Sequence, residues 1–210
     1  MKLAIFDLGN VLFRIDSPKA LAFLARRAGI SPQMLRERIS MGPDFEAFER
    51  GELSEAPFFD WLDERLGVNL ETELLIQGWN AIFGPVIRPT YEAIRRLRQH
   101  MHVVALTNTN PTHQRAWQAI YEVELGVFKK IYISSELGMR KPEKRIYRHV
   151  IEEWKVSPEE TVFFDDLHEN IQAAAEIGMA AQWVTGDTIA TKWVDDYISE
   201  RKLSRTGLPE

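Results

Sequence analysis

Polar side chains that could do chemistry follow short apolar runs of this sequence. The first run, residues 2–6, ends directly before a carboxylate. The set comprises Asp7, then Thr107 with Asn108, then Lys141 in the loop beyond a third run, and finally Asp165 with Asp166. In open α/β sheets, ligands bind outside the carboxyl ends of the strands, where the strand order reverses. We therefore expect these side chains to form the walls of one site, with Asp7 at its centre.

The carboxylates of this set predict a divalent cation. Two or three carboxylates brought to one point cannot all be ionised without a compensating charge. Mg²⁺ suits a site made of a few carboxylates, waters and a substrate phosphate oxygen. Lys141, Asn108 and Thr107 are then donors for a phosphoryl group. The sequence has neither a GxxxxGK[ST] nor a GxGxxG phosphate loop, and attack by a carboxylate on phosphorus is the covalent route consistent with the set.

Strand-like runs alternate with helical periodicity along most of the chain. After the first run, apolar runs occupy 103–106, 130–133, 161–164 and 181–184. Helices are expected between and after them, at 90–99, 110–121, 142–154, 170–177 and 189–203. This alternation predicts a parallel sheet covered by helices on both faces.

Residues 15–88 interrupt the alternation with helices that are rich in aromatic residues. Turn chemistry bounds this stretch, with Ser17-Pro18 at its start and Gly84-Pro85 and Arg88-Pro89 at its end. The last of its helices is expected from about Leu70 to Phe83. The predicted fold is therefore α/β, with a Rossmann-like core formed by 1–14 and 89–210. An all-helical cap domain, 15–88, is inserted after the first strand.

Composition argues against several classes of function. The 210 residues are 45% hydrophobic and 27% charged, which is typical of a globular protein with a substantial core. A net charge of -5 without a basic block argues against nucleic acid as a partner. The absence of cysteine excludes disulfides and thiolate metal sites. We expect no signal peptide and no membrane span, and hence a cytoplasmic enzyme. We also expect a monomer or a weak homo-oligomer.

The motifs resemble those of the haloacid dehalogenase-like (HAD) hydrolases over nearly the whole chain. Residues 7–11 (DLGNV) are similar to the first motif of that family, and 106–108 (LTN) to the second. Residues 138–142 (GMRKP) are similar to the third, and Asp165-Asp166 with Asn170 to the fourth. Any one motif is weak, whereas four in order are specific. The DLGNV form resembles bacterial sugar phosphatases, notably the α-D-glucose-1-phosphate phosphatase type.

The resemblance implies a role for each residue of the set. Asp7 would be the nucleophile and a Mg²⁺ ligand, Gly9 would offer its backbone carbonyl to the metal, and Asp166 would be the third protein ligand. Asp165 and Asn170 would contact the metal ligands or bind the metal through water. Thr107, Asn108 and Lys141 would hold the phosphoryl group. The implied reaction is hydrolysis of a small phosphorylated metabolite, such as a hexose 1-phosphate, through an aspartyl-phosphate.

Gly9 departs from the commonest family pattern, in which an Asp at this position is the general acid and base. Such proton transfer contributes about 10²–10⁴-fold to the rate. Three explanations stay open: a leaving group that needs no proton, a substitute donor, or a poor phosphatase. Candidate substitutes are a water or one of the cap residues Glu46, Glu49 and Glu52.

Two other functions stay open for the same residues. In a metal-independent 2-haloacid dehalogenase Asp7 would attack carbon, but Asp165 and Asp166 would then leave an excess of negative charge. A non-catalytic phosphate-binding or interaction protein is the second alternative, because Gly9 replaces the usual acid and base. His113 and His168 lack metal-ligand spacing, and we expect both to be solvated residues near helix starts.

Overall fold

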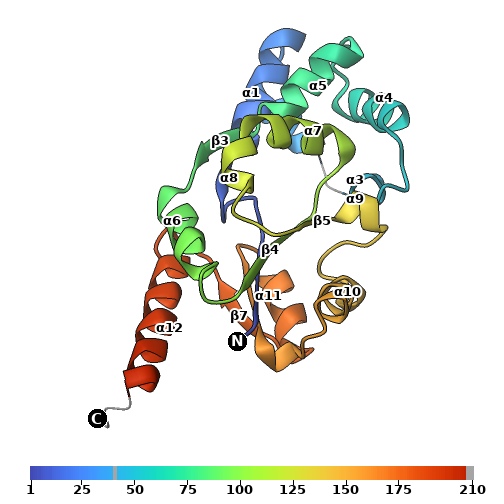
Figure 1. Ribbon diagram of the computed structural model, residues 1–210. Helices are drawn as coiled ribbons and strands as arrows, with labels where there is room; N and C mark the ends of the chain where they lie inside the picture. The colour runs from blue at the N-terminus through green and yellow to red at the C-terminus, as the bar shows by residue number, and fades with distance from the viewer. Residues whose placement is uncertain (40–41, 207–210) are drawn as a thin grey trace.

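A parallel five-stranded sheet forms the centre of the molecule in the computed structural model, which describes residues 1–39 and 42–206. The strand order is β5-β4-β1-β6-β7 (Figure 1). The strands are β1 (Leu3–Phe6), β4 (His102–Thr107), β5 (Ile131–Ile133), β6 (Thr161–Asp165) and β7 (Ala180–Trp183). Each strand lies within one residue of its predicted bounds, so the predicted sheet is confirmed. The predicted cap and core ranges also contain 40–41 and 207–210, which lie outside the described residues.

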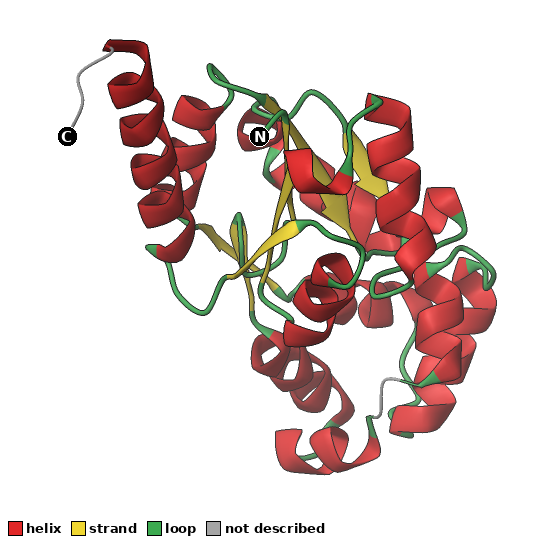
Figure 2. Cartoon of the chain, turned by 90° about the horizontal axis from the view of Figure 1, so that it is seen from below, coloured by secondary structure: helices red, strands yellow, loops and turns green. Residues whose placement is uncertain are grey.

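Helices cover both faces of this sheet, as the alternation predicts (Figure 2). Successive side chains of a strand point to opposite faces, so Leu3 and Ile5 contact one helical layer and Ala4 and Phe6 the other. The first layer consists of α10 (Lys144–Trp154) and α11 (His168–Ala175). The second consists of α6 (Arg88–Leu97), α7 (Pro111–Ile120), α8 (Glu122–Leu125) and α12 (Ile189–Thr206). The short α9 (Ser134–Leu137) and the 3₁₀ helix η1 (Pro158–Glu160) lie in connections.

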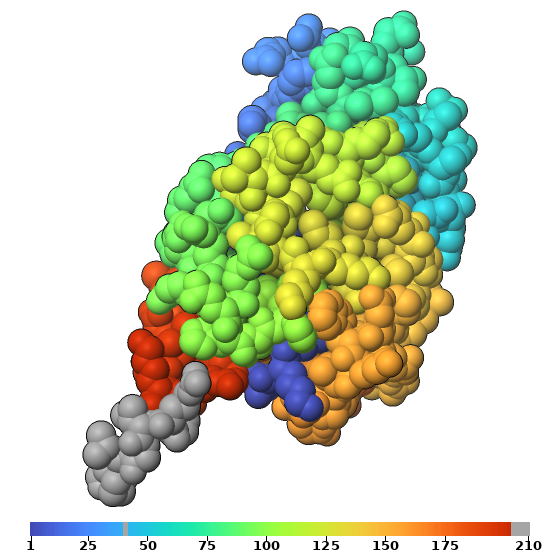
Figure 3. All heavy atoms as spheres, in the orientation of Figure 1, coloured from blue at the N-terminus to red at the C-terminus, as the bar shows by residue number. Residues whose placement is uncertain are grey.

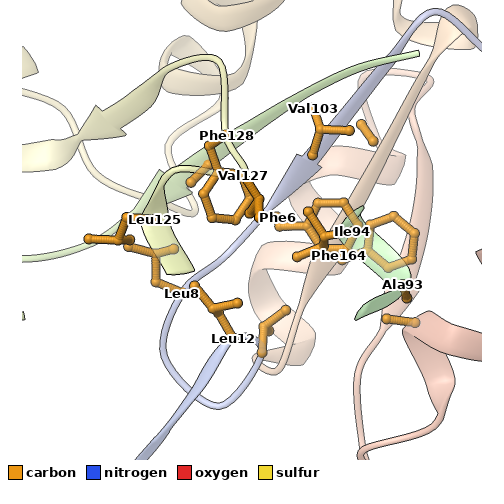
Figure 4. Close-up of a cluster of buried hydrophobic side chains, with 14 of the residues drawn as sticks. Phe6, Leu8, Leu12, Ala93, Ile94, Val103, Leu125, Val127, Phe128 and Phe164 are labelled. Carbon is orange, nitrogen blue, oxygen red and sulfur yellow. The ribbon is translucent and has the colours of Figure 1, made fainter. Parts of the chain in front are cut away.

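The core between the sheet and the second layer fixes the register of the central strands. Phe6 and Phe164 are fully buried and stack with ring centroids 4.2 Å apart, next to Ile94 of α6 (Figure 4). Burying a side chain of this size contributes about 1.5–3 kcal/mol. Because Phe6 lies opposite Phe164 in the ladder, the residues that follow them, Asp7 and Asp165, emerge side by side at the same edge of the sheet.

Five helices of the described residues that precede α6 pack around a hydrophobic cluster of their own. They are α1 (Ser17–Ala28), α2 (Pro32–Arg38), α3 (Pro43–Glu49), α4 (Glu55–Leu66) and α5 (Thr72–Asn80). Phe48 and Phe58 stack at its centre with centroids 3.9 Å apart. These helices lie beyond the carboxyl end of β1, at the top of Figures 1 and 3. We call residues 15–88 the cap.

The ends of the cap differ from the all-helical prediction. The strands β2 (Phe13–Ile15) and β3 (Phe83–Val86) form an antiparallel ribbon that joins the cap to the core. The helix predicted to reach Phe83 ends at Asn80. Gly84 and Pro85 are poor helix formers, and a Cβ on Gly84 would come within 2.9 Å of the Arg14 Cβ. Close pairing with β2 therefore replaces the last helical turn. No helix in the described ranges is long and apolar enough to span a membrane.

Candidate active site

A buried lysine bridges two carboxylates where the central strands end. Asp7 follows β1, and its Oδ1 lies 2.9 Å from the Nζ of Lys141. The same Nζ donates to Asp165 Oδ2 at 2.6 Å. Lys141 is 1% exposed, so solvent screens these contacts little. The two strand ends and the loop before α10 thus converge as predicted.

Asp166 completes a cluster of three carboxylates. One oxygen each of Asp7, Asp165 and Asp166 lies within 4.8 Å of the other two. The ammonium group of Lys141 offsets one of the three negative charges. When all three acids are ionised, two negative charges therefore remain uncompensated. A divalent cation that prefers oxygen ligands matches both this charge and this spacing. The donor set therefore fits the predicted Mg²⁺.

The surroundings of Asp7 and Lys141 raise the pKa of both groups. Burial raises the pKa of Asp7 to about 7; the Lys141 ammonium lowers it, and Asp165 and Asp166 raise it further. Burial also raises the pKa of Asp166. For Lys141, burial lowers the pKa, but the charges of Asp165 and Asp7 outweigh this effect and raise it above its usual value. The lysine is therefore a permanent cation beside Asp7.

Asp165 is held from three directions. Its Oδ1 accepts hydrogen bonds from the Leu167 backbone N–H at 2.8 Å and from the Asn170 side chain at 2.9 Å. Its Oδ2 accepts from Lys141. Asn170 is buried in the first turn of α11. With its oxygens engaged in this way, Asp165 orients Lys141, and Asn170 in turn orients Asp165.

Asn10 is a site residue to which the sequence analysis gave no role. Its Nδ2 donates to Asp166 Oδ2 at 2.9 Å, and its Oδ1 accepts from the Ile15 backbone N–H at 3.0 Å. Asn10 adopts a left-handed backbone with φ of 53°, which Asn tolerates better than most residues. The turn after β1 thus links the loop that follows Asp7 to the fourth motif. Its position in the DLGNV motif is the sequence feature that could have identified it as a site residue.

Asn108 holds the main chain of Lys141. Its Nδ2 donates to the Lys141 carbonyl at 2.8 Å, and its Oδ1 accepts from the Lys141 N–H at 2.8 Å. The motif resemblance implies that this amide holds a phosphoryl group, whereas both its ends bind the backbone of Lys141. The geometry gives Asn108 the task of positioning the lysine. Thr107 is buried at the end of β4 and lines the same cavity as Asp7.

A cavity of about 360 Å³ extends from Asp7 and Lys141 into the cap. Gly9 lines it, and a Cβ at Gly9 would lie 3.1 Å from Ile15 Cγ1. Beyond the carboxylates the wall is mostly apolar and is contributed by α1, α3, α4, α5 and the β2–β3 ribbon. The cap therefore lies over Asp7 and contributes most of the cavity wall.

Of the three glutamates considered as substitute acids, Glu49 is the one that lines this cavity. It is buried and accepts from Arg140 Nε at 3.0 Å. Burial raises the pKa of Glu49, although Arg140 lowers it. Arg50 lies 3.5 Å from Glu143 nearby. These pairs join the end of α3 to the loop that carries Lys141, so cap and core meet at the site.

His113 contradicts the expectation of a solvated histidine. It lines the cavity, stacks on Trp79 with centroids 4.8 Å apart, and its Nε2 lies 3.1 Å from the Trp79 carbonyl. Burial lowers its pKa to about 4, so it is neutral at physiological pH. Packing of α7 against α5, which are distant in sequence, places it there. His168 is exposed, as expected.

Residues 1–178 match the sequence profile of the haloacid dehalogenase-like hydrolase family. The chain belongs to this family, which confirms the resemblance carried by its four motifs.

Two curated relatives of similar length are phosphatases. A D-ribitol-5-phosphate phosphatase of Bacteroides thetaiotaomicron is 30% identical over 184 residues, covering 85% of this chain and 89% of that protein. A sesquiterpene phosphatase of Aspergillus oryzae is 31% identical over 197 residues, covering 90% and 92%. Among solved structures, a HAD-family enzyme of Bacteroides thetaiotaomicron in complex with magnesium and inorganic phosphate superposes with a TM-score of 0.75, at 26% identity, covering 87% of this chain and 93% of that one.

Proposed function

We propose that the protein is a Mg²⁺-dependent phosphatase that hydrolyses a small phosphomonoester through an aspartyl-phosphate on Asp7. The observation that carries the proposal is the convergence of Lys141, Asp165 and Asp166 on Asp7, at one end of the cavity. The phosphatase relatives and the magnesium and phosphate complex of a similar enzyme support it.

In the first half of the proposed reaction, an oxygen of Asp7 attacks phosphorus and the P–O bond to the alcohol breaks. Lys141 and Thr107 offset the charge on the phosphoryl oxygens. The leaving oxygen takes a proton from water or from Glu49, which lines the cavity. In the second half, water attacks the aspartyl-phosphate and releases inorganic phosphate, which regenerates the Asp7 carboxylate.

The residues that would hold the metal are Asp7, Asp166 and the Gly9 carbonyl. Bound Mg²⁺ supplies positive charge next to the transferring phosphoryl group and lets several carboxylates ionise together. Asp165 is not one of these ligands, because it accepts a hydrogen bond from Lys141 and holds that side chain in place. Asn10 keeps Asp166 turned towards the site.

The same observations disfavour the two alternatives. A metal-independent dehalogenase gains nothing from three clustered carboxylates, which Lys141 alone cannot neutralise. A non-catalytic phosphate binder does not need an acid at Asp7, which repels a phosphate anion when no cation is present. The relatives named above are a D-ribitol-5-phosphate phosphatase and a sesquiterpene phosphatase, and the carbon skeletons in these two names differ widely. The hexose 1-phosphate suggested by the motif resemblance is one finer hypothesis for this chain.

Hydrolysis of p-nitrophenyl phosphate, measured with Mg²⁺ and with EDTA, tests the proposal. We expect phosphate release that requires Mg²⁺ and is lost in Asp7→Asn. Halide release from a 2-haloacid that is insensitive to EDTA would instead identify a dehalogenase. Absence of both activities in a protein that binds phosphate would favour the non-catalytic alternative. The cytoplasmic location and the monomeric or weakly oligomeric state stay predictions.

A further inference from the structure

We infer that the cavity beside Asp7 binds an alcohol whose body is hydrocarbon, so that the preferred substrate is an apolar phosphomonoester rather than a polyol phosphate. The inference rests on the proposed phosphatase function, because it concerns the alcohol that the reaction releases. It departs from the sugar phosphate that the motif resemblance suggests. It follows from the chemistry of the cavity wall beyond the phosphoryl end.

Apolar side chains make up most of that wall. The cavity has a volume of about 360 Å³, which is in the range of small-molecule sites. Its polar end contains Asp7 and Lys141. Further in, the wall is formed by Leu21, Leu24, Phe45, Leu62, Trp79 and Phe83. Transfer of hydrocarbon from water to such a surface is favourable, whereas the surface has no hydrogen-bond partners for a row of hydroxyl groups.

Two polar side chains that line the cavity, those of Glu49 and His113, already have partners. Glu49 is paired with Arg140 at 3.0 Å. His113 contacts the Trp79 carbonyl through Nε2, at 3.1 Å, and the Asn110 side chain through Nδ1, at 3.3 Å. A polyol in this cavity would leave hydroxyl groups buried without partners. Each unpaired hydroxyl weakens binding by about five- to 150-fold.

One donor in the wall is unused within the described residues. The indole Nε1 of Trp79 is buried and has no hydrogen-bond partner among them. This nitrogen has almost no accessible surface, so it offers no hydrogen bond to an alcohol in the cavity. The cavity therefore suits a hydrocarbon, and we expect an alkyl phosphate to be hydrolysed faster than a polyol phosphate of equal carbon count.

A substrate series on the wild-type protein with Mg²⁺ tests the inference. Methyl, propyl and pentyl phosphate are compared with ribitol 5-phosphate, which matches pentyl phosphate in carbon number. We expect kcat/KM to rise about fourfold for each added methylene that enters the cavity, and pentyl phosphate to exceed ribitol 5-phosphate at least tenfold. Equal values along the alkyl series, or a preference for ribitol 5-phosphate, would overturn the inference.

Binding measurements separate this inference from the proposed function. Methylphosphonate and pentylphosphonate, which cannot be hydrolysed, are titrated into the protein with Mg²⁺ by calorimetry. Tighter binding of pentylphosphonate supports the apolar site even if no ester is hydrolysed, in which case the phosphatase proposal fails alone. Mg²⁺-dependent hydrolysis with tighter binding of polyol phosphates would leave the phosphatase standing and remove the apolar site.

A matched pair of variants on α1 localises the effect. Ala20 lines the cavity, whereas Ala22 is exposed on the same helix. Ala20→Leu adds three carbons to the cavity wall, and we expect the ratio of kcat/KM for pentyl over methyl phosphate to fall at least tenfold. Ala22→Leu should leave the ratio unchanged. An unchanged ratio in a folded Ala20→Leu protein would contradict the assignment, and the wild-type series decides the matter if that variant does not fold.

Discussion

Asp7→Asn should make the metal-free protein more stable while abolishing its activity. The pKa of Asp7 is raised from 3.8 to about 7, mainly by burial. The folded protein therefore binds more protons than the unfolded chain between these two values. The free energy of unfolding consequently falls as the pH rises through this window, and reaches its lower plateau above the folded pKa. Asn, which carries no charge, is free of this cost.

The magnitude follows from the same pKa. A tenfold change in an ionisation constant is worth about 1.4 kcal/mol, so ionised Asp7 costs about 4 kcal/mol at pH above about 7 and about 2 kcal/mol near pH 5. We expect the stability advantage of Asp7→Asn over wild type to grow by about 2–3 kcal/mol between about pH 5 and about pH 8. Urea denaturation in EDTA at both pH values measures it.

Mg²⁺ and a surface variant serve as controls for this prediction. Saturating Mg²⁺ should stabilise the wild type more than Asp7→Asn, because the cation offsets the charge that the variant lacks. Asp60→Asn, on the exposed face of α4, should show the pH dependence of the wild type. If the difference between Asp7→Asn and wild type does not change with pH in EDTA, burial and charge crowding at Asp7 are not as described.

Three further predictions concern the residues around the nucleophile. Lys141→Met leaves two buried carboxylates without their cation; we expect a loss of about 3–5 kcal/mol in urea denaturation and a fall of at least about 10²-fold in kcat on p-nitrophenyl phosphate. Asn108→Ala removes both hydrogen bonds to the Lys141 backbone; kcat should fall up to about 10²-fold, with KM for Mg²⁺ little changed, and an unaltered kcat would remove the positioning role. Gly9→Asp, after a small shift of Ile15, should raise turnover on alkyl phosphates by about 10²–10⁴-fold but much less on p-nitrophenyl phosphate. If the variant hydrolyses each substrate at the same rate as the wild type, the absence of an acid at this position does not limit the rate.

The sheet and its acidic edge could be predicted from the sequence because both depend on local patterns. A buried parallel strand is a short continuous apolar run, and the polar residue that ends it marks the functional edge. Asp7, Thr107 and Asp165 each follow from this rule. The helices of the cap were also predictable from their periodicity. The β2–β3 ribbon was not, because its pairing joins Phe13 to Val86 across the whole cap and leaves no local repeat.

The sequence by itself determined which polar residues follow the apolar runs, whereas only the tertiary structure decided how they are held and what surrounds them. Asn108 engages a backbone 33 positions away, and Glu49 meets Arg140 at a separation of 91. Contacts of this kind depend on the packing of cap on core, which no short window of sequence encodes. The apolar cavity also depends on this packing, because a hydrophobic residue in a helix gives the same sequence pattern whether it fills a core or lines a binding site.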